Sequence, residues 1–223
     1  MREYYEAYDD RYRQVHALSL DWLGTDPSPV VMDVLNRYAI SRSDKLLEIG
    51  CGEGRDAHFL LRNGFDVLAT DVSAEAICYC RSKALGNEER FRVLDCVTER
   101  TDERYDFIYA VAVLHMLVQD RHRDAFYAFI RDALKLQGIA LVCSMGDGTV
   151  TRSSDITKAF ELQERIHEAT GTVVKIAGTS CRIVDDAIFE REIYRNGLTV
   201  LEKGITETVP GFDRMMYAVI KKA

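Results

Sequence analysis

The spacing of hydrophobic and polar positions changes near residue 45. Before that point, from Tyr4 to Trp22, aromatic and aliphatic residues recur mostly at helical spacing, and this stripe stops at Gly24. A second, shorter helix is expected over Val30–Tyr38. The pattern therefore predicts that residues 1–40 form a helical N-terminal lid, distinct from the remainder, 41–223.

From Lys45 onward, short apolar runs alternate with amphipathic stretches. Strands are expected over Lys45–Ile49, Asp66–Thr70, Phe91–Leu94, Phe107–Val111 and Ile139–Cys143. Helices are expected over Asp56–Arg62, Ala74–Leu85 and Asp120–Leu136. Such alternation is typical of a doubly wound α/β fold, with a mainly parallel sheet and helices on both of its faces.

The last third of the chain departs from this alternation. Residues 147–184 are expected to be an insertion beside the substrate, made of a polar loop (Asp147–Ser153), a helix (Ile156–Ala169, capped by Asp155) and a loop or short strand to Val184. A helix over Asp185–Arg195 should follow. Strands are then expected over Leu198–Thr206 and Met215–Ile220. Because their connection is short, this final pair should be antiparallel.

Composition narrows the class of protein. The chain has 223 residues, of which 47% are hydrophobic and 29% charged, as in an ordinary globular domain. The formal net charge of −7 argues against nucleic acid as the main partner. No apolar run is long enough to span a membrane, and the polar first residues do not resemble a signal peptide. A cytoplasmic location is expected.

The six cysteines do not indicate a metal site. No two of them have the Cys-x-x-Cys spacing that is typical of zinc ligands. We therefore expect no bound metal, and reduced thiols that pack as small hydrophobic side chains.

The strongest motif is a glycine-rich turn between the first expected strand and the helix after it. Gly50, Gly52 and Gly54 stand where a ligand can approach the main chain, because no Cβ blocks it and positive φ is available. A dinucleotide fingerprint starting at Gly50 would require glycine at position 55, and Arg55 stands there. A turn that cradles a pyrophosphate, as in nicotinamide-dependent dehydrogenases, is thus disfavoured.

Two aspartates end the next two strands. Asp71 can accept hydrogen bonds from both hydroxyls of a ribose, and Asp95 can contact a purine edge. For Asp71 the alternative is an N-cap of the following helix, although Ser73 suits that role.

These segments resemble the motifs of class I S-adenosylmethionine-dependent methyltransferases. LLEIGCGEG is similar to their first motif, LATDVS to the ribose-binding strand end, RVLDC to the adenine-binding turn, and YDFIYAVAVLH and LKLQGIALV to their fourth and fifth strands. The resemblance implies a Rossmann-like sheet of seven strands with a reversed C-terminal strand. It also implies S-adenosyl-L-methionine as cofactor and S-adenosyl-L-homocysteine as product.

The resemblance carries over a set of cofactor-binding positions. Glu48 precedes the glycine turn, and in the family the acid at this position contributes to the cofactor site near the methionine group. The alternative is that Glu48 is a structural carboxylate that caps the turn. The complete predicted set is Glu48, Gly50, Cys51, Gly52, Gly54, Asp71, Val72, Asp95, Cys96, Ala110 and Val111.

The acceptor is expected to be a small molecule that is methylated on O, N or S. GCGEGRDAHFLLRNGFDVLATDVS is similar to thiopurine- and tellurite-type enzymes, whereas VLHML resembles the ubiquinone/menaquinone-type branch. A quinone-type C-methyltransferase is therefore one alternative, and a non-catalytic cofactor-binding sensor is another. Both a monomer and a homodimer are compatible with the sequence.

Residues beside the methyl group are candidates for acceptor chemistry. His115 follows the fourth strand and could remove a proton from the acceptor, or it could only pack in the turn. Tyr4 and Tyr8 of the lid, together with Arg152 and Arg182 of the insertion, could contact the acceptor, or they could serve packing and solvation. Alignment of the two reactants can itself supply most of the acceleration.

Overall fold

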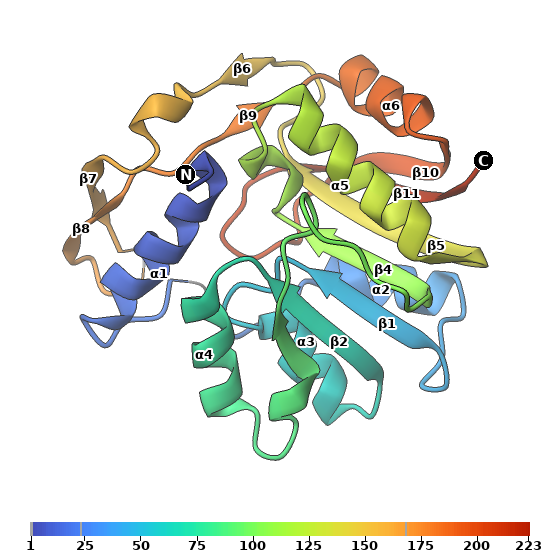
Figure 1. Cartoon of the computed structure of the whole chain (residues 1–223), viewed down its shortest axis with the longest axis horizontal. Helices are drawn as coiled ribbons and strands as arrows, with labels where there is room; N and C mark the ends of the chain where they lie inside the picture. The colour runs from blue at the N-terminus through green and yellow to red at the C-terminus, as the bar shows by residue number, and fades with distance from the viewer. Residues whose placement is uncertain (1, 23, 168) are drawn as a thin grey trace.

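The computed structural model describes residues 2–22, 24–167 and 169–223. Its centre is a seven-stranded sheet with the strand order β10-β11-β5-β4-β1-β2-β3 (Figure 1). The first five strands are β1 (Lys45–Ile49), β2 (Asp66–Asp71), β3 (Phe91–Val93), β4 (Tyr105–Val111) and β5 (Leu134–Met145). All neighbouring pairs among these five are parallel, which confirms the predicted mainly parallel sheet.

The reversed C-terminal strand is also confirmed. The last two strands are β10 (Leu198–Thr206) and β11 (Met215–Lys222), and β11 lies antiparallel between β10 and β5. The winding direction changes between β1 and β4, since β2 and β3 extend the sheet on one side and β5 on the other. In open α/β sheets this switch point, at the carboxyl ends of the strands, is where ligands bind.

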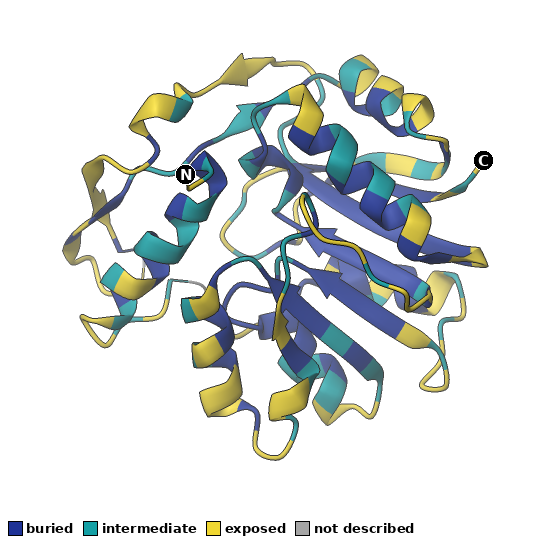
Figure 2. Cartoon of the chain, viewed as in Figure 1, coloured by how far each residue is buried: buried dark blue, intermediate teal, exposed yellow. Residues whose placement is uncertain are grey.

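Helices cover both faces of the sheet, as predicted. One face carries α2 (Pro29–Arg37), α3 (Arg55–Arg62) and α4 (Ala74–Lys83), and the other carries α5 (Asp120–Ala133) and α6 (Asp186–Arg195). The buried positions of these helices face the strands (Figure 2). A short 3₁₀ turn, η2 (Glu88–Arg90), leads into β3.

The helix expected over Asp120–Leu136 ends three residues earlier, at Ala133. Leu134 is instead the first residue of β5, where it is fully buried and pairs with Tyr105. A Cβ at Gly138 would lie 2.8 Å from the carbonyl oxygen of Tyr105. Gly138 therefore allows the extended chain to run closely along β4, with Leu134 buried and Leu136 exposed.

The helix expected over Ile156–Ala169 is wrong. Asp155 does act as a cap, but only of a 3₁₀ turn, η4 (Ile156–Lys158). The chain then forms an antiparallel hairpin of β7 (Leu162–Ile166) and β8 (Val173–Ala177). The inward side chains of β8 pack against the N-terminal helix, and this tertiary contact favours a strand over a helix. The insertion also contains β6 (Arg152–Ser153), in the segment expected to be a loop, paired with β9 (Arg182–Ile183).

The N-terminal helix is confirmed, but it is shorter than the stripe suggests. A 3₁₀ turn, η1 (Tyr4–Glu6), leads into α1 (Ala7–His16). The helix does not continue to Trp22, because the chain turns at Ser19, which has a φ of 57°. Figure 1 shows α1 between the insertion hairpin and the carboxyl ends of the strands.

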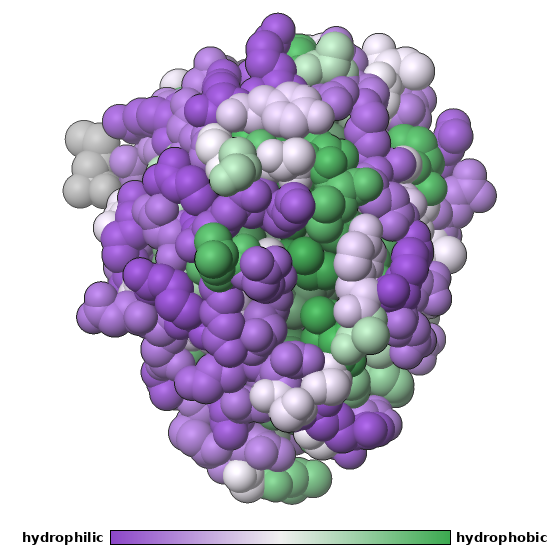
Figure 3. Space-filling view, turned by 90° about the vertical axis from the view of Figure 1, so that its right-hand side faces the viewer, coloured by the Kyte–Doolittle hydropathy of each residue, from purple (hydrophilic) through white to green (hydrophobic). Residues whose placement is uncertain are grey.

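The side of the molecule that faces away from α1 is mostly polar. Figure 3 shows it as mostly hydrophilic, interrupted by a strip of hydrophobic residues. On the edge strand β10, Leu201 and Ile205 are exposed. Among the described residues, no helix has both the length and the apolar character that crossing a membrane requires.

Candidate functional site

The glycine turn after β1 has a backbone that only glycine adopts easily. Gly50, Gly52 and Gly54 have φ values of 70°, 53° and 80°. A Cβ at Gly50 would lie 2.4 Å from Cγ2 of Val113, a side chain that follows β4. The turn is therefore shaped both by its own dihedral angles and by close packing against the neighbouring strand end.

Asp71 holds this turn from the end of β2. Its carboxylate accepts hydrogen bonds from the backbone N–H groups of Gly52 and Ser73, both at 2.8 Å. Ser73 caps α4 by accepting a bond from the N–H of Ala76 at 3.0 Å, so the N-cap role belongs to Ser73. Burial raises the pKa of Asp71, and the two backbone donors oppose that shift.

Asp95 occupies the equivalent place after β3. One carboxylate oxygen accepts the N–H of Val97 at 2.9 Å. The other accepts the hydroxyls of Thr98 at 2.8 Å and Tyr5 at 2.9 Å. Tyr5 belongs to η1 and α1, residues 4–16, which we call the lid from here on, and it reaches the carboxylate that the sequence predicts to contact a purine.

A cavity of about 60 Å³ joins these groups. It is lined by Tyr5, Tyr8, Tyr12, Ile49, Gly50, Asp71, Val72, Leu94, Asp95, Cys96, Val97, Val113, Met116 and Leu117. The predicted site residues that the structure brings together here are Gly50, Asp71, Val72, Asp95, Cys96 and Tyr8. The structure thus places residues from four strand ends and the lid around one space.

The other predicted cofactor residues lie outside this lining. Glu48 is buried beneath the turn, where it accepts a bond from the hydroxyl of Tyr109 at 3.1 Å. Its pKa is raised well above the ordinary value, first by burial and then by the charge of Asp56. The others are also buried: Cys51, Gly52 and Gly54 in the turn, and Ala110 and Val111 in β4.

Three tyrosines of the lid form one wall of the cavity, and of these Tyr8 belongs to the predicted substrate residues. Tyr5, Tyr8 and Tyr12 all line it, and their spacing of three and four residues was a usable signal. Tyr12 is buried. Burial raises the pKa of its hydroxyl, and the charges of Asp71 and Glu53 raise it further.

His115 lies in a 3₁₀ turn after β4, η3 (Leu114–Met116), and outside the cavity lining. Its Nδ1 accepts the N–H of Met145 at 3.4 Å, and its ring meets Phe212 edge to face at 6.0 Å. Burial, aided by the charge of Arg123, lowers its pKa to about 4. The imidazole is therefore neutral near pH 7.

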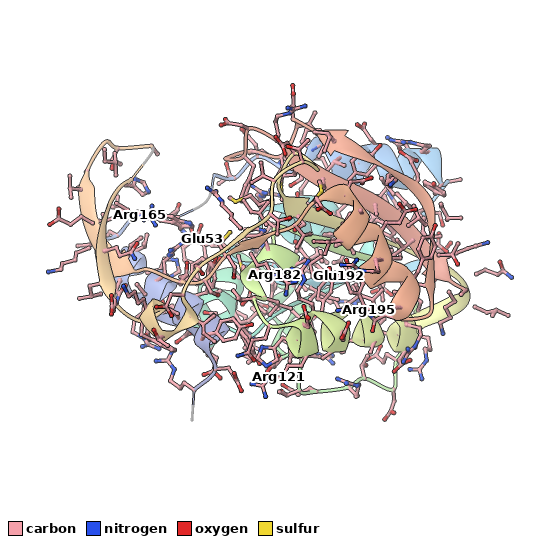
Figure 4. The ribbon with its side chains drawn as sticks, turned by 90° about the horizontal axis from the view of Figure 1, so that it is seen from above. Glu53, Arg121, Arg165, Arg182, Glu192 and Arg195 are labelled. Atoms are coloured by element: carbon pink, nitrogen blue, oxygen red, sulfur yellow. The ribbon has the colours of Figure 1, made fainter. Side chains whose placement is uncertain are left out.

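Side chains from outside residues 114–119 hold the backbone of this segment, which contributes one cavity wall. Arg123 donates to the carbonyl oxygens of Leu114 at 2.8 Å and Leu117 at 3.2 Å. Its guanidinium forms a buried ion pair with Glu192 of α6 at 2.7 Å, and Figure 4 shows where Glu192 lies. We call residues 114–119 the clamped wall.

Two predicted substrate residues also act on the clamped wall. Arg182 donates to the carbonyl oxygen of Val118 at 2.8 Å and to Asp120 at 2.6 Å (Figure 4). The hydroxyl of Tyr4 accepts the N–H groups of Val118 and Gln119 at 2.8 and 3.0 Å. The remaining predicted substrate residue, Arg152, is exposed on β6 opposite Ile183.

Among residues 2–22, 24–167 and 169–223, no three His, Cys, Asp or Glu side chains come together as metal ligands would. All six cysteines are free thiols. Of Cys51 and Cys96, the two that flank the site in the sequence, Cys96 lines the cavity.

Comparison with known proteins agrees with this geometry. A family model described as a methyltransferase domain matches residues 46–138. An uncharacterised methyltransferase of Schizosaccharomyces pombe is 25% identical over 195 residues, covering 83% of this chain and 75% of that protein.

Two solved methyltransferases share the fold. CcbJ from Streptomyces caelestis superposes with a TM-score of 0.71 at 17% identity, covering 98% of this chain and 99% of its own. The glycopeptide N-methyltransferase MtfA, solved with S-adenosylmethionine, has a TM-score of 0.65 at 19% identity, covering 89% and 95% of the two chains. Residues 46–138 thus match a methyltransferase domain, and the chain has the fold of these solved methyltransferases.

Proposed function

We propose that the protein binds S-adenosylmethionine in the cavity and transfers its methyl group to a small-molecule acceptor. The observation that carries this proposal is the position of Asp71, whose carboxylate holds the glycine turn and also lines the cavity. The residues present fit the cofactor. Gly50 of the turn lines the cavity beside Asp71, and Asp95 stands on the same cavity.

Each part of the cavity has a role in this proposal. Asp71 accepts the ribose hydroxyls, and Asp95 accepts the amino group of the adenine. Leu94, Cys96 and Val97 supply an apolar surface for the purine ring. When bound, S-adenosylmethionine supplies an activated methyl group.

The acceptor would lie against the remaining walls, which are aromatic and apolar. Tyr8 comes from the lid, and Val113, Met116 and Leu117 come from the chain after β4. These side chains exclude water and orient an acceptor of small size. Well-oriented reactants gain about 7–11 kcal/mol from proximity, so alignment is the main contribution we assign to the protein.

His115 remains a candidate base, because a neutral imidazole can accept a proton. Its burial outside the cavity lining makes packing the competing role. A pH–rate profile decides between them: if His115→Gln shows the wild-type profile, His115 is not the base.

Calorimetric titration with S-adenosylmethionine and S-adenosylhomocysteine tests the proposal. We expect Asp71→Ala to weaken binding at least tenfold, because a hydrogen bond to a charged group contributes about 1.5–3 kcal/mol. Asp102→Ala, at an exposed carboxylate in a loop, is the matched control and should bind as the wild type does. Equal affinity of the folded Asp71→Ala protein would refute the ribose assignment, and absence of binding by the wild type would refute the function.

The acceptor is then sought by its chemistry. Release of S-adenosylhomocysteine is measured across thiols, phenols, amines and carboxylates of small size. Turnover of any class supports the transfer. Tight cofactor binding without turnover of any class would favour a cofactor-binding sensor instead.

A further inference from the structure

One histidine joins the lid to two other parts of the site. His16 is the last residue of α1, and its side chain is 10% exposed. Its Nε2 lies 3.0 Å from Oε1 of Glu53, in the glycine turn. Its Nδ1 lies 2.9 Å from Oε1 of Glu75, in the first turn of α4. Figure 4 shows Glu53 on the side of the sheet that faces α1.

These two bonds require two protons on the ring. An ionised carboxylate only accepts hydrogen bonds, and a neutral imidazole has a single N–H group to donate. The Oε1 atom of Glu53 also accepts the backbone N–H of Trp22 at 2.6 Å, as an ionised carboxylate oxygen would. The geometry therefore fits an imidazolium between two carboxylates, and loss of one proton would set a ring lone pair against an oxygen lone pair.

The remaining groups around His16 are compatible with that charge. Its ring stacks on Tyr79 of α4 at 4.6 Å and lies 5.9 Å from Tyr12 of its own helix. Tyr79 donates its hydroxyl to Asp21 at 2.7 Å, and the cation facing the Tyr79 ring is Lys83, at 5.2 Å. The carboxyl end of a helix also favours a cation.

The position of this contact connects it to the cavity. The lid contributes Tyr5, Tyr8 and Tyr12 to the cavity wall, so its placement decides whether that wall is complete. Asp9 makes a second link to α4, accepting the hydroxyl of Ser73 at 2.8 Å and the N–H of Glu75 at 3.0 Å. That link contains no histidine, so the proton dependence resides in His16.

We propose that His16, in its protonated form, is a positioning residue that holds the lid against the glycine turn and α4. The lid then completes the cavity while the imidazole of His16 is protonated, and loosens when the imidazolium loses its proton to the solvent. The part of this inference that concerns cofactor affinity rests on the proposed function. The part that concerns the lid does not.

The chain offers a reporter for the lid itself. Trp22 is its sole tryptophan, its backbone binds Glu53, and its ring lies 5.0 Å from the guanidinium carbon of Arg11. Tryptophan fluorescence of the ligand-free protein is followed from pH 5.5 to 9. We expect a transition in the wild type that His16→Gln abolishes, with circular dichroism showing that the variant is folded.

A second histidine near Trp22 supplies the control. Nε2 of His167 lies 2.6 Å from the backbone oxygen of Asp21, so His167 could also alter the fluorescence. His167→Gln should keep the transition. If His16→Gln keeps it, or if His167→Gln loses it, the assignment to His16 is overturned.

Glu75→Gln tests the mechanism without removing the histidine. Its amide can donate to a neutral ring nitrogen, so the contact no longer requires a second proton. The fluorescence transition should shift to higher pH or disappear. An unchanged transition would contradict the two-carboxylate explanation, even if His16 itself proves necessary.

Cofactor binding is the final readout. The dissociation constant of S-adenosylhomocysteine should rise about tenfold between pH 6 and 8.5 in the wild type, the value of one charge-assisted hydrogen bond, and stay level in His16→Gln. Equal pH dependence in both proteins would overturn the link between lid and cofactor. Absence of binding at every pH would instead contradict the proposed function, while the fluorescence result for the lid would stand.

Discussion

The two halves of the cavity are held together in different ways. The contacts of Asp71 that hold the glycine turn are the more local ones in the chain: Asp71 binds Gly52, 19 residues before it, and Ser73, two residues after it. The clamped wall after β4 depends on distant side chains. Val118 bonds to Tyr4, 114 residues away, and to Arg182, 64 residues away. The first half is thus shaped by its own turns, and the second by the packing of the whole chain.

Removing the central ion pair of the clamped wall should have the largest effect. Arg123 and Glu192 are 0% and 1% exposed, so Arg123→Met leaves a buried carboxylate without its cation. We expect the free energy of unfolding in urea to fall by about 3–5 kcal/mol. Native molecules should still bind the cofactor, because the local half does not involve Arg123.

Two further variants make this measurement decisive. Arg195→Met breaks the half-exposed pair with Asp124 and should change stability by no more than about 1 kcal/mol. The double variant Arg123→Met/Glu192→Met should regain much of the loss, since no charge is left buried. Equal losses in Arg123→Met and Arg195→Met would mean that the buried pair does not organise this half.

A smaller effect is expected where the two halves touch. Gly50→Ala forces a side chain into the left-handed region, where φ is 70°, and directs its Cβ at Val113. We expect cofactor binding to weaken at least tenfold, because the turn must move to relieve about 1–3 kcal/mol of strain and contact.

Gly86→Ala separates strain from contact. Gly86 has a φ of 94°, but nothing lies within 4 Å of its added Cβ. This control should lose stability without losing cofactor affinity. If both variants bind the cofactor as the wild type does, the contact between Gly50 and Val113 does not shape the site.

The same contrast explains which features could be predicted from the sequence. The glycine turn, Asp71 and the Ser73 cap depend on neighbours in the chain, so motif and position were enough to find them. The order of elements around the sheet followed from the alternation of strands and helices for the same reason. The helix boundary at Ala133 was missed because strand pairing with Tyr105, which is not local, decides the state of Leu134.

Features that depend on packing could not be predicted in this way. The hairpin of β7 and β8 exists because β8 packs on α1, and an isolated reading of residues 156–169 favours a helix. The sequence predicted Tyr4 and Arg182 as acceptor contacts. Their bonds to the backbone of Val118, however, are visible only in three dimensions.

His115, in the turn after β4, should make the free energy of unfolding depend on pH by about 1 kcal/mol. The pKa of His115 is lowered from 6.5 to about 4 in the folded protein. Between pH 6.5 and 4, His115 binds a proton in the unfolded chain but not in the folded protein. The destabilisation that results is absent above pH 6.5 and grows as the pH falls toward 4. At pH 5.5 the wild type should have lost about 1 kcal/mol through this residue.

The measurement is urea unfolding at pH 7.5 and 5.5 for the wild type and His115→Gln. The difference between the two pH values should shrink by about 1 kcal/mol in the variant. An equal difference in both proteins would show that the burial of His115 after β4 does not govern its protonation.

The smallest expected effect separates two roles for Arg182. If Arg182 only holds the clamped wall through the carbonyl oxygen of Val118, Arg182→Met loses one hydrogen bond and shifts that wall slightly. KM for any acceptor should then rise about threefold, equally for neutral and anionic acceptors, with the cofactor dissociation constant unchanged. If Arg182 instead binds the acceptor, KM should rise for carboxylates and phosphates alone.

Arg182→Lys keeps the charge but not the paired geometry toward Val118 and Asp120, so it should rescue anionic acceptors only if Arg182 binds the acceptor. A selective rescue would make the insertion a direct recognition element, and a uniform threefold loss would confirm that distant residues shape this half of the cavity through the backbone.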